Sequence, residues 1–443
     1  MKRFNGIALS VAFCSLASQA ALAQTKIDTL KVQNLNEVIV KGVRAAKEAP
    51  YAVANIRKSE LKQFSCSGQE LPFLLSRTPG ILAWSENGIG TGTTYMRIRG
   101  AAGSRINVTL DGVALNSPED QTVFWANMNS YSSLLGSIQV QRGVGSSTNG
   151  DGAFGGSISM ATAAPSLTPT AEVTGSFGSY NTYHTGASFS TGLLGKHLIF
   201  DGAYHETATD GYVDGTAGRS GSYYGGLTWL GDNFKVSYKN IGNFEKTGQA
   251  WSGVLGGDYN SNFTLLDDGI RTYKDMYKAG LDKFNVLTGD LVRNGKSDYT
   301  ITPYTLRDGS KWDKTTDNFY QNHNILSATW TPGSHWSHSL SLHYTYGYGY
   351  YKEFKNNAKF AKFGLIYKDA EGNKVKKSDF IRKKGLTQHT YGMVYNTNYK
   401  DEHWDVIGGL NLQQFRGNHW GYLTYIANQD AEKKFFGSNG QYK

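Results

Sequence analysis

Beyond Pro165 the chain repeats one pattern that few folds can satisfy: apolar side chains alternate with small or polar ones at every second position. The clearest stretch has Leu or Tyr at even positions from 340 to 350, and Ser, His, Thr or Gly at odd positions from 339 to 349. Successive side chains of a strand point to opposite faces, so a two-residue period indicates strands whose two faces lie in different solvents.

About nine strands follow this pattern. They are predicted near 171–180, 182–193, 196–208, 221–231, 233–246, 318–331, 336–352, 387–400 and 403–419. Two long polar insertions, roughly 247–317 and 353–386, interrupt them, and a shorter excursion lies around 210–220. Membrane barrels carry short turns at one rim and long loops at the other, so we expect both long insertions to be extracellular.

The composition favours a membrane barrel over a soluble sandwich. Glycine (53) and tyrosine (28) are abundant and proline (8) is rare, and no apolar run after residue 23 reaches the roughly 20 residues of a membrane-spanning helix. A sandwich would instead bury its aromatic face against a second sheet. The net charge of +9 is not gathered into a basic face, so we expect no nucleic acid as a partner. The apolar face of the predicted barrel strands implies outer-membrane lipid as a partner.

The N-terminus predicts export. Lys2 and Arg3 precede an apolar stretch over 7–17 and a small-residue site at 21–23, which is the pattern of a secretory signal peptide at residues 1–23. The alternative is a buried first helix. Cys66 is the only cysteine after the predicted cleavage site, so no intrachain disulfide is expected.

Residues 24–165 carry a series of short motifs, with possible helices at 59–64 and 69–77. The motifs are Leu35-Asn36-Glu37-Val38-Ile39-Val40-Lys41, Thr78-Pro79-Gly80-Ile81, Met96-Arg97-Ile98-Arg99-Gly100, Asn107-Val108-Thr109-Leu110-Asp111-Gly112-Val113, Ile138-Gln139-Val140-Gln141-Arg142-Gly143, and Gly152-Ala153-Phe154-Gly155-Gly156-Ser157-Ile158-Ser159-Met160. Singly they are strand-turn pieces with Asp-Gly and Gly-Gly at the corners. In order and spacing they resemble the plug domain of TonB-dependent outer-membrane receptors. Val144, in place of the usual proline, and the approach 148–150 depart from the family pattern.

The resemblance implies an α+β plug domain (50–165) followed by an antiparallel transmembrane β-barrel (166–443) in the cell outer membrane. A periplasmic TonB-coupling segment (24–49) would precede them. The family takes up a scarce nutrient chelate, commonly a ferric siderophore, haem or cobalamin, and is energised by TonB. The segment that TonB pulls maps to Asn36, Glu37, Val38, Ile39 and Val40. An exposed β-prone run can pair with a partner strand by β-augmentation, although it could also be an ordinary first plug strand.

The size of the plug bears on the barrel. A compact plug over 24–165 has a diameter of roughly 35 Å, whereas ten tilted strands close at only about 22 Å. A barrel of roughly 22 strands can hold such a plug. The sequence therefore predicts an incomplete barrel of about nine strands, and a truncated or partial reading frame.

The hairpin after Ile81 and the loop after Val113 are expected to point outward and touch the ligand. The predicted ligand-binding residues are Trp84, Ser85, Glu86, Asn87, Asn116, Glu119, Asp120, Gln121, Phe124 and Trp125. Aromatic and carboxamide groups can hold a chelate without removing its metal. The alternatives are calcium ligation by Glu119 and Asp120, or ordinary exposed turns.

Arg99 and Arg142 occupy the Arg-Gly pairs of the plug pattern. In the family such arginines face carboxylates on late barrel strands and help to lock the plug. We therefore expect both to lack a barrel carboxylate here and to rely on plug carbonyl groups or solvent. Simple surface arginines are the alternative.

Enzyme function has no supporting constellation: no catalytic residues, no cofactor and no metal site are predicted. His335 and His338 could be metal ligands but fit solvated turn histidines better. The opposing functions are a surface adhesin, or a glycan or peptide importer on the same barrel. Only about a dozen residues separate Gln24 from Asn36, which favours a chelate importer, because glycan importers of the family carry an extra N-terminal domain.

Overall fold

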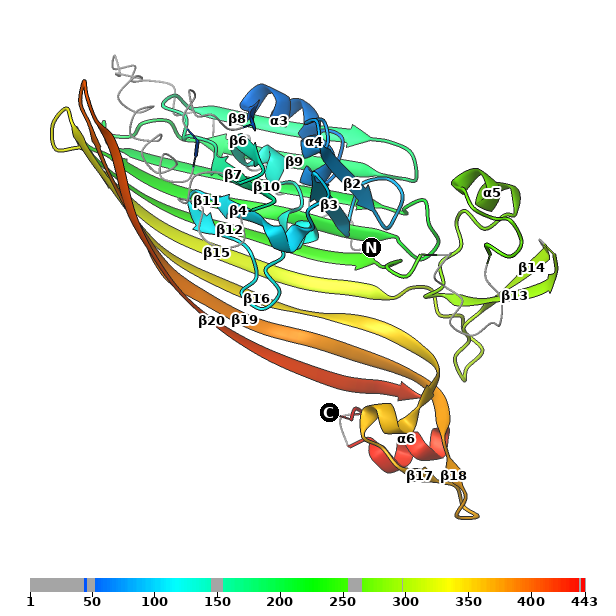
Figure 1. Cartoon of the computed structure of the whole chain (residues 1–443). Coiled ribbons are helices and arrows are strands. Elements are labelled where there is room, and N and C mark those ends of the chain that lie inside the picture. The colour runs from blue at the N-terminus through cyan, green and yellow to red at the C-terminus, as the bar shows by residue number, and fades with distance from the viewer. Residues whose placement is uncertain are drawn as a thin grey trace.

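The computed structural model describes residues 44–45, 52–144, 154–253, 265–296, 298–437 and 440–442. The predicted signal peptide and the segment Asn36–Val40 lie outside these residues. The described chain forms an N-terminal domain of short helices and strands, which lies against one face of a large curved sheet (Figure 1). The boundary between the two parts agrees with the start of the alternating pattern near Pro165 in the sequence.

The N-terminal domain is built on a five-stranded sheet. Its strands are β1 (Ala52–Arg57), β4 (Ile106–Leu110), β5 (Val113–Ala114), β6 (Leu135–Arg142) and β7 (Gly156–Thr162), in the order β1-β6-β7-β4-β5. Only the β4–β7 pair is parallel. The remaining elements are α3 (Lys58–Ser65), α4 (Leu71–Leu75), the hairpin β2 (Ile81–Ser85) and β3 (Thr94–Ile98), and the 3-10 turns η2 (Gly103–Arg105), η3 (Trp125–Met128) and η4 (Tyr131–Ser133).

The two predicted helices are present, but the second is shorter than 69–77. Helix α4 ends at Leu75 and is capped by Ser76. Pro79 follows soon after, and a proline disfavours helical backbone in the residue before it. The chain therefore turns into β2 at this point.

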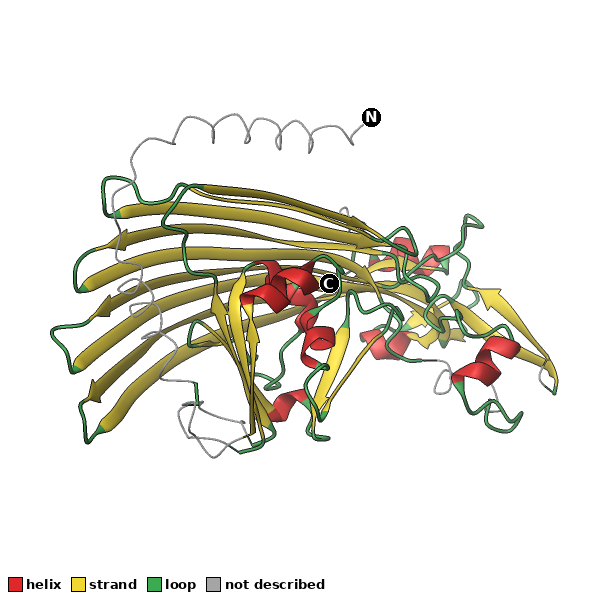
Figure 2. Ribbon diagram, turned by 90° about the horizontal axis from the view of Figure 1, so that it is seen from above, coloured by secondary structure: helices red, strands yellow, loops and turns green. Residues whose placement is uncertain are grey.

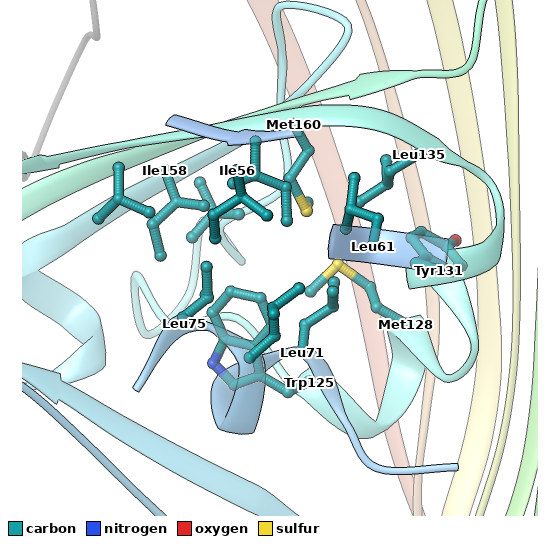
Figure 3. Close-up of a cluster of buried hydrophobic side chains, with 14 of the residues drawn as sticks. Ile56, Leu61, Leu71, Leu75, Trp125, Met128, Tyr131, Leu135, Ile158 and Met160 are labelled. Atoms are coloured by element: carbon teal, nitrogen blue, oxygen red, sulfur yellow. The ribbon is translucent and has the colours of Figure 1, made fainter. Parts of the chain in front are cut away.

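The five-stranded sheet has one apolar and one polar face. On the apolar face, Ile138, Val140, Ile158 and Met160 are each at most 1% exposed. Figure 3 shows this face packed against Leu61 of α3 and Leu71 and Leu75 of α4, with Trp125 and Met128 completing the cluster. The opposite face carries the serines and glutamines that alternate with these residues along β6 and β7.

The large sheet contains nine antiparallel strands, which confirms the predicted number. They are β8 (Thr170–Phe177), β9 (Tyr183–Ser190), β10 (Leu198–Thr209), β11 (Gly218–Leu230), β12 (Phe234–Gly248), β15 (Thr316–Trp330), β16 (Trp336–Lys359), β19 (Lys377–Lys400) and β20 (Asp405–Ile426). Each pairs with its neighbour in sequence, so β8 and β20 stand at opposite edges and the sheet is open.

The connections at one rim are short, at 191–197, 231–233, 331–335 and 401–404. The other rim carries the insertions, and Figure 2 shows short helices and loops at that end of the sheet. The first insertion contains α5 (Tyr273–Lys278), β13 (Gly289–Gly295) and β14 (Asp298–Pro303), and α6 (Gln429–Phe435) follows β20 at the same rim.

The predicted insertion 353–386 is wrong at both ends. Strand β16 continues to Lys359 and β19 begins at Lys377, so the connection is 360–376 and holds η6 (Phe360–Phe363), β17 (Tyr367–Lys368) and β18 (Lys374–Val375). Within this predicted insertion, Arg382 of β19 pairs with Glu353 of β16: Arg382 Nη2 lies 2.7 Å from Glu353 Oε1. Buried Phe360 and Phe380 also hold the extended strands together.

The outer face of the sheet matches a membrane surface. The aromatic side chains Trp229, Phe234, Trp330, Trp336 and Trp404 are 37–66% exposed and lie near the ends of strands at the short-turn rim. Farther along the strands the exposed side chains include Leu227, Leu326, Leu342, Leu410 and Leu412. An aromatic row beside an aliphatic band is typical of the lipid-facing side of outer-membrane barrels. Separately, no helix within the described residues is long and apolar enough to cross a membrane.

The inner face of the sheet packs on the N-terminal domain. Ile241 of β12 is 1% exposed and belongs to the same hydrophobic cluster as Leu75, with Ala203 and Tyr224 beside it. The two parts therefore share one core.

We expect Leu75→Ala to destabilise the N-terminal domain by about 2–5 kcal/mol, because Leu75 is fully buried and alanine leaves a cavity. Leu82→Ala, at a position that is 61% exposed, is the matched control and should cost far less. Urea titration of the protein in outer-membrane vesicles, followed by protease sensitivity of the domain, measures both. Equal midpoints for the two variants would contradict the assigned core.

Candidate functional site

A cavity of about 350 Å³ lies between one part of the N-terminal domain and the inner face of the sheet. The loop 114–124 and η3 form one side, and β15, β16, β19 and β20 form the other. The lining residues of β15 belong to its first half and those of β16 mostly to its second half, which places the cavity toward the insertion rim. Its volume falls in the range of small-molecule sites.

Aromatic and carboxamide side chains dominate the wall of the cavity. The wall residues of these two kinds are Phe319, Gln321, Tyr350, Tyr351, Gln388, Gln413 and Phe415. Sequence reasoning did not single them out. Except for Tyr350, which has the parity of the lipid-facing residues of β16, they occupy the strand positions that alternate with the lipid-facing residues, so the alternation could have found them.

The loop side of the cavity starts at a tight turn. Asp111 and Gly112 both have positive φ, of 49° and 83°, as the two central residues of a type I′ hairpin turn require. The turn joins β4 to β5 and sends the chain out along the inner face of the sheet. Asp and Gly are the residue types that tolerate this backbone at low cost.

Both the oxygen and the nitrogen of the Asn116 side-chain amide form hydrogen bonds that fix the conformation of the loop. Its Oδ1 accepts from the Val108 N–H at 2.8 Å, and its Nδ2 donates to the carbonyls of Ile106 and Gln121, both at 2.8 Å. Asn116 lines the cavity as predicted, but its amide groups are engaged within the loop.

Glu119 spans the cavity. Both of its carboxylate oxygens lie 3.0 Å from His419 Nε2 on β20. Asp120 accepts from the Thr122 N–H at 3.0 Å, and Phe124 is 50% exposed. These three predicted residues therefore come together at the cavity.

Trp125 and Gln121 do not join them. The expectation that Trp125 points outward is wrong: it is 5% exposed and lies in the core cluster of the domain (Figure 3). It begins η3, and that turn buries its large ring beneath the sheet. Gln121 has a positive φ of 59° at a bend of the loop and does not line the cavity.

The other four predicted ligand residues belong to the β2–β3 hairpin, which contacts the rim elsewhere. The Tyr212 N–H donates to the Asn87 carbonyl at 2.9 Å, and the Ala250 N–H donates to Glu86 Oε2 at 2.7 Å. Asn87 is only 4% exposed, which corrects its prediction as an outward-facing group. Ser85 accepts from the Gly90 N–H at 2.9 Å, and Trp84, 40% exposed, stacks on Tyr95.

The two parts are joined by a buried ion pair that sequence reasoning missed. Lys239 Nζ of β12 donates to Asp111 Oδ2 at 2.7 Å and to Thr162 Oγ1 at 2.5 Å. The side chains are 12% and 6% exposed. Burial alone would raise the pKa of the Asp111 carboxyl, but the Lys239 charge and the hydrogen bonds from Thr162 outweigh it and hold that pKa below its usual value.

The predicted locking arginines are placed differently. Arg142 Nη1 donates to the Pro79 carbonyl at 2.8 Å, a domain carbonyl as expected. Arg99 is exposed, with a φ of 49°, and follows the buried residue Ile98 at the end of β3. Neither makes an ion pair with a carboxylate in the part of the chain that the structure describes.

The histidines that could suggest a metal site have other contacts. His335 Nδ1 lies 3.0 Å from the Lys400 carbonyl oxygen, and His338 Nδ1 lies 3.0 Å from the Tyr395 hydroxyl. Both rings also pack against aromatic side chains at the short-turn rim.

A buried carboxyl lies at the start of α4. Glu70 is 1% exposed, and its Oε1 accepts from Asn129 Nδ2 at 2.7 Å and from the Gly92 N–H at 3.2 Å. Burial raises the pKa of Glu70 to about 8, and the two hydrogen bonds offset only part of that effect. The protonated carboxyl ties α4 to η3 and to the β2–β3 hairpin.

We expect Asp111→Asn to cost about 3–5 kcal/mol, because it leaves the Lys239 charge buried without a counter-charge. The double variant Asp111→Asn/Lys239→Met should recover part of that loss. Asp308→Asn, in an exposed turn, is the control. Release of the N-terminal domain with rising urea measures all three, and a cost for Asp111→Asn no larger than that of the control would remove the ion pair as a major contact.

The stability of the domain should fall as the pH rises. The folded pKa of Glu70 is raised above its ordinary value of 4.5 to about 8, so its contribution is complete below pH 4.5 and is lost as the pH rises through about 8. Glu70→Gln mimics the protonated acid and should flatten this dependence, whereas Glu60→Gln, at an exposed site, should not. Unfolding midpoints across this pH window test the assignment, and an unchanged slope in Glu70→Gln would refute it.

Comparison with known proteins follows the same division of the chain. Residues 45–157 match the family described as the TonB-dependent receptor plug domain. No curated protein matches the chain significantly.

Several solved structures share the fold. The ferric preacinetobactin receptor BauA from Acinetobacter baumannii aligns with a TM-score of 0.57 at 12% identity, over 87% of this chain and 51% of that one. The pyoverdine receptor FpvA from Pseudomonas aeruginosa PAO1 gives 0.53 at 13% identity, over 86% and 48%. The ferric-catecholate import receptor Fiu from Escherichia coli K12 gives 0.51 at 12%, over 86% and 54%.

The chain thus spans about half the length of the receptors that it resembles. At these identities the likeness concerns the fold: an N-terminal domain on the inner face of an antiparallel barrel wall. Residues 45–157 are therefore the plug domain of a TonB-dependent receptor, and the nine strands that follow have the fold of the barrel wall of such outer-membrane proteins.

Proposed function

We propose that the protein takes up a scarce nutrient chelate, of the ferric siderophore, haem or cobalamin type, across the outer membrane. TonB would supply the energy by pulling on the segment Asn36–Val40. The observation that carries this proposal is the cavity between the plug loop 114–124 and the barrel wall. A ligand that enters from the insertion rim would reach a cavity with this loop on one side and the barrel wall on the other.

The chemistry of the cavity suits a chelate more than a bare ion. Phe124 on the loop and Phe319 and Phe415 on the wall offer flat apolar surface, and Gln321 and Gln388 offer both donors and acceptors. Such groups hold an organic ligand through its periphery and leave its metal coordinated. The solved receptors for ferric preacinetobactin and pyoverdine share this fold and support the same class of ligand.

The plug also favours transport over adhesion. A surface adhesin needs no domain inside its barrel and no coupling segment outside it. Here the plug shares a hydrophobic core with β12 and is fixed to that strand by the Asp111–Lys239 pair.

We expect Phe124→Ala and Phe415→Ala each to weaken chelate binding about tenfold, since an aromatic contact contributes about 1.5 kcal/mol. Tyr277→Ala, at a position that is 69% exposed and outside the cavity, is the control. Binding of a panel of ferric hydroxamate and ferric catecholate chelates, followed by fluorescence quenching, measures the effect.

A peptide spanning residues 34–44 should capture the periplasmic domain of TonB. A surface adhesin would bind neither the chelates nor TonB.

A further inference from the structure

Arg44 grips the middle of the plug sheet. Its Nη1 donates to Ser137 Oγ at 3.0 Å and its Nη2 to the Ser137 carbonyl at 3.2 Å. Its Nε donates to Ser159 Oγ at 3.3 Å, and its Nη2 also donates to the Ser159 carbonyl at 3.0 Å. Ser137 belongs to β6 and Ser159 to β7, so one guanidinium spans two inner strands on the polar face of the sheet.

The next residue is held in the same place. The Ala45 N–H donates to Gln139 Oε1 at 2.7 Å, and Gln139 Nε2 donates back to the Ala45 carbonyl at 3.2 Å. The side-chain amide of Gln139 thus pairs with a backbone unit as a neighbouring strand would. We call Arg44, Ala45 and their three partners on β6 and β7 the Arg44 clasp.

The strand gripped by the clasp leads to the ion pair on the barrel wall. Three residues beyond Ser159, the Thr162 N–H donates to Asp111 Oδ1 at 3.0 Å, and Lys239 holds the same carboxylate. Burial lowers the pKa of the Arg44 guanidinium, and the Asp111 charge opposes that change. The clasp and the Asp111–Lys239 pair are therefore electrostatically connected as well as joined through β7.

We propose that Arg44 is the joint through which tension on the coupling segment enters the plug. The proposal rests on the function proposed above, because Arg44 lies four residues beyond Val40. Tension reaching the clasp loads two inner strands together and is passed along β7 to the contact with the wall. Arg44 is thus a positioning residue for transport and touches no ligand in this role.

Without the clasp, the load would fall on β1. Among the described residues, that strand is at the edge of the sheet and has β6 as its one partner strand. Tension would then pull β1 away from β6 and would not load the central strands of the plug sheet. With the six hydrogen bonds of the clasp in place, tension loads β6 and β7 before it can detach β1.

Single-molecule pulling on the membrane-embedded protein tests this directly. A covalent handle at Gln33→Cys, in a Cys66→Ser background, applies tension without requiring TonB. In the parent protein we expect a first rupture that precedes the unravelling of the plug. Arg44→Ala should lose that event, and Arg44→Lys, which keeps the charge without the planar fork, should lower its force. Ser137→Ala/Ser159→Ala should also lower the force of the first rupture, and Arg97→Ala, an exposed arginine, should change nothing.

The outcomes separate the clasp from the proposed function. If Arg44→Ala lowers the thermal midpoint but keeps the first rupture, the residue has only a structural role and the inference is overturned. If TonB fails to bind the segment Asn36–Val40 while the Arg44-dependent rupture remains, the proposed energisation fails and the mechanical joint stands. An identical trace for parent and Arg44→Ala, with TonB bound normally, defeats the inference alone.

Discussion

The nine-stranded sheet has lipid on its outer face and the plug domain on its inner face. The rest of the structure depends on how the plug packs against that inner face. The outer face offers Trp, Tyr and Leu side chains to lipid. The inner face offers polar side chains together with Ile241, Ala203 and Tyr224, which pack against the plug. The wall and the plug are thus parts of one folding unit, because residues of both complete the same hydrophobic cluster.

The plug is held to the wall with unequal strength along its length. The Asp111–Lys239 pair is almost fully buried, so breaking one partner leaves a desolvated charge. The Glu119–His419 pair is 39% and 58% exposed, and exposed pairs contribute little to stability. The loop beside the cavity can therefore separate from β20 at small cost while the plug stays anchored to β12. Under the proposed function, that difference would let the site admit a ligand before the plug itself moves.

Some of the ligand-binding residues predicted from the sequence lie at the cavity and others are buried, because the local backbone turns their side chains in different directions. Glu119, Asp120 and Phe124 lie at the cavity, as their place in a polar loop predicts. Trp125 is the very next residue, yet η3 turns its ring into the core. Asn87 is buried because its hairpin docks on the rim and its carbonyl binds Tyr212. Adjacent positions in a loop have no fixed alternation of faces, so the sequence pattern could not separate these cases.

The sequence by itself determined the number of strands and, for most strand residues, the face that each takes, because alternation follows from the local geometry of an extended chain. The plug motifs likewise indicated the fold of residues 50–165. Only the tertiary structure decided which distant groups meet. Asp111 and Lys239 are 128 residues apart, Arg44 and Ser159 are 115 apart, and Glu119 and His419 are 300 apart. Such pairs depend on the register and curvature of the whole sheet, and no local pattern of residues encodes either.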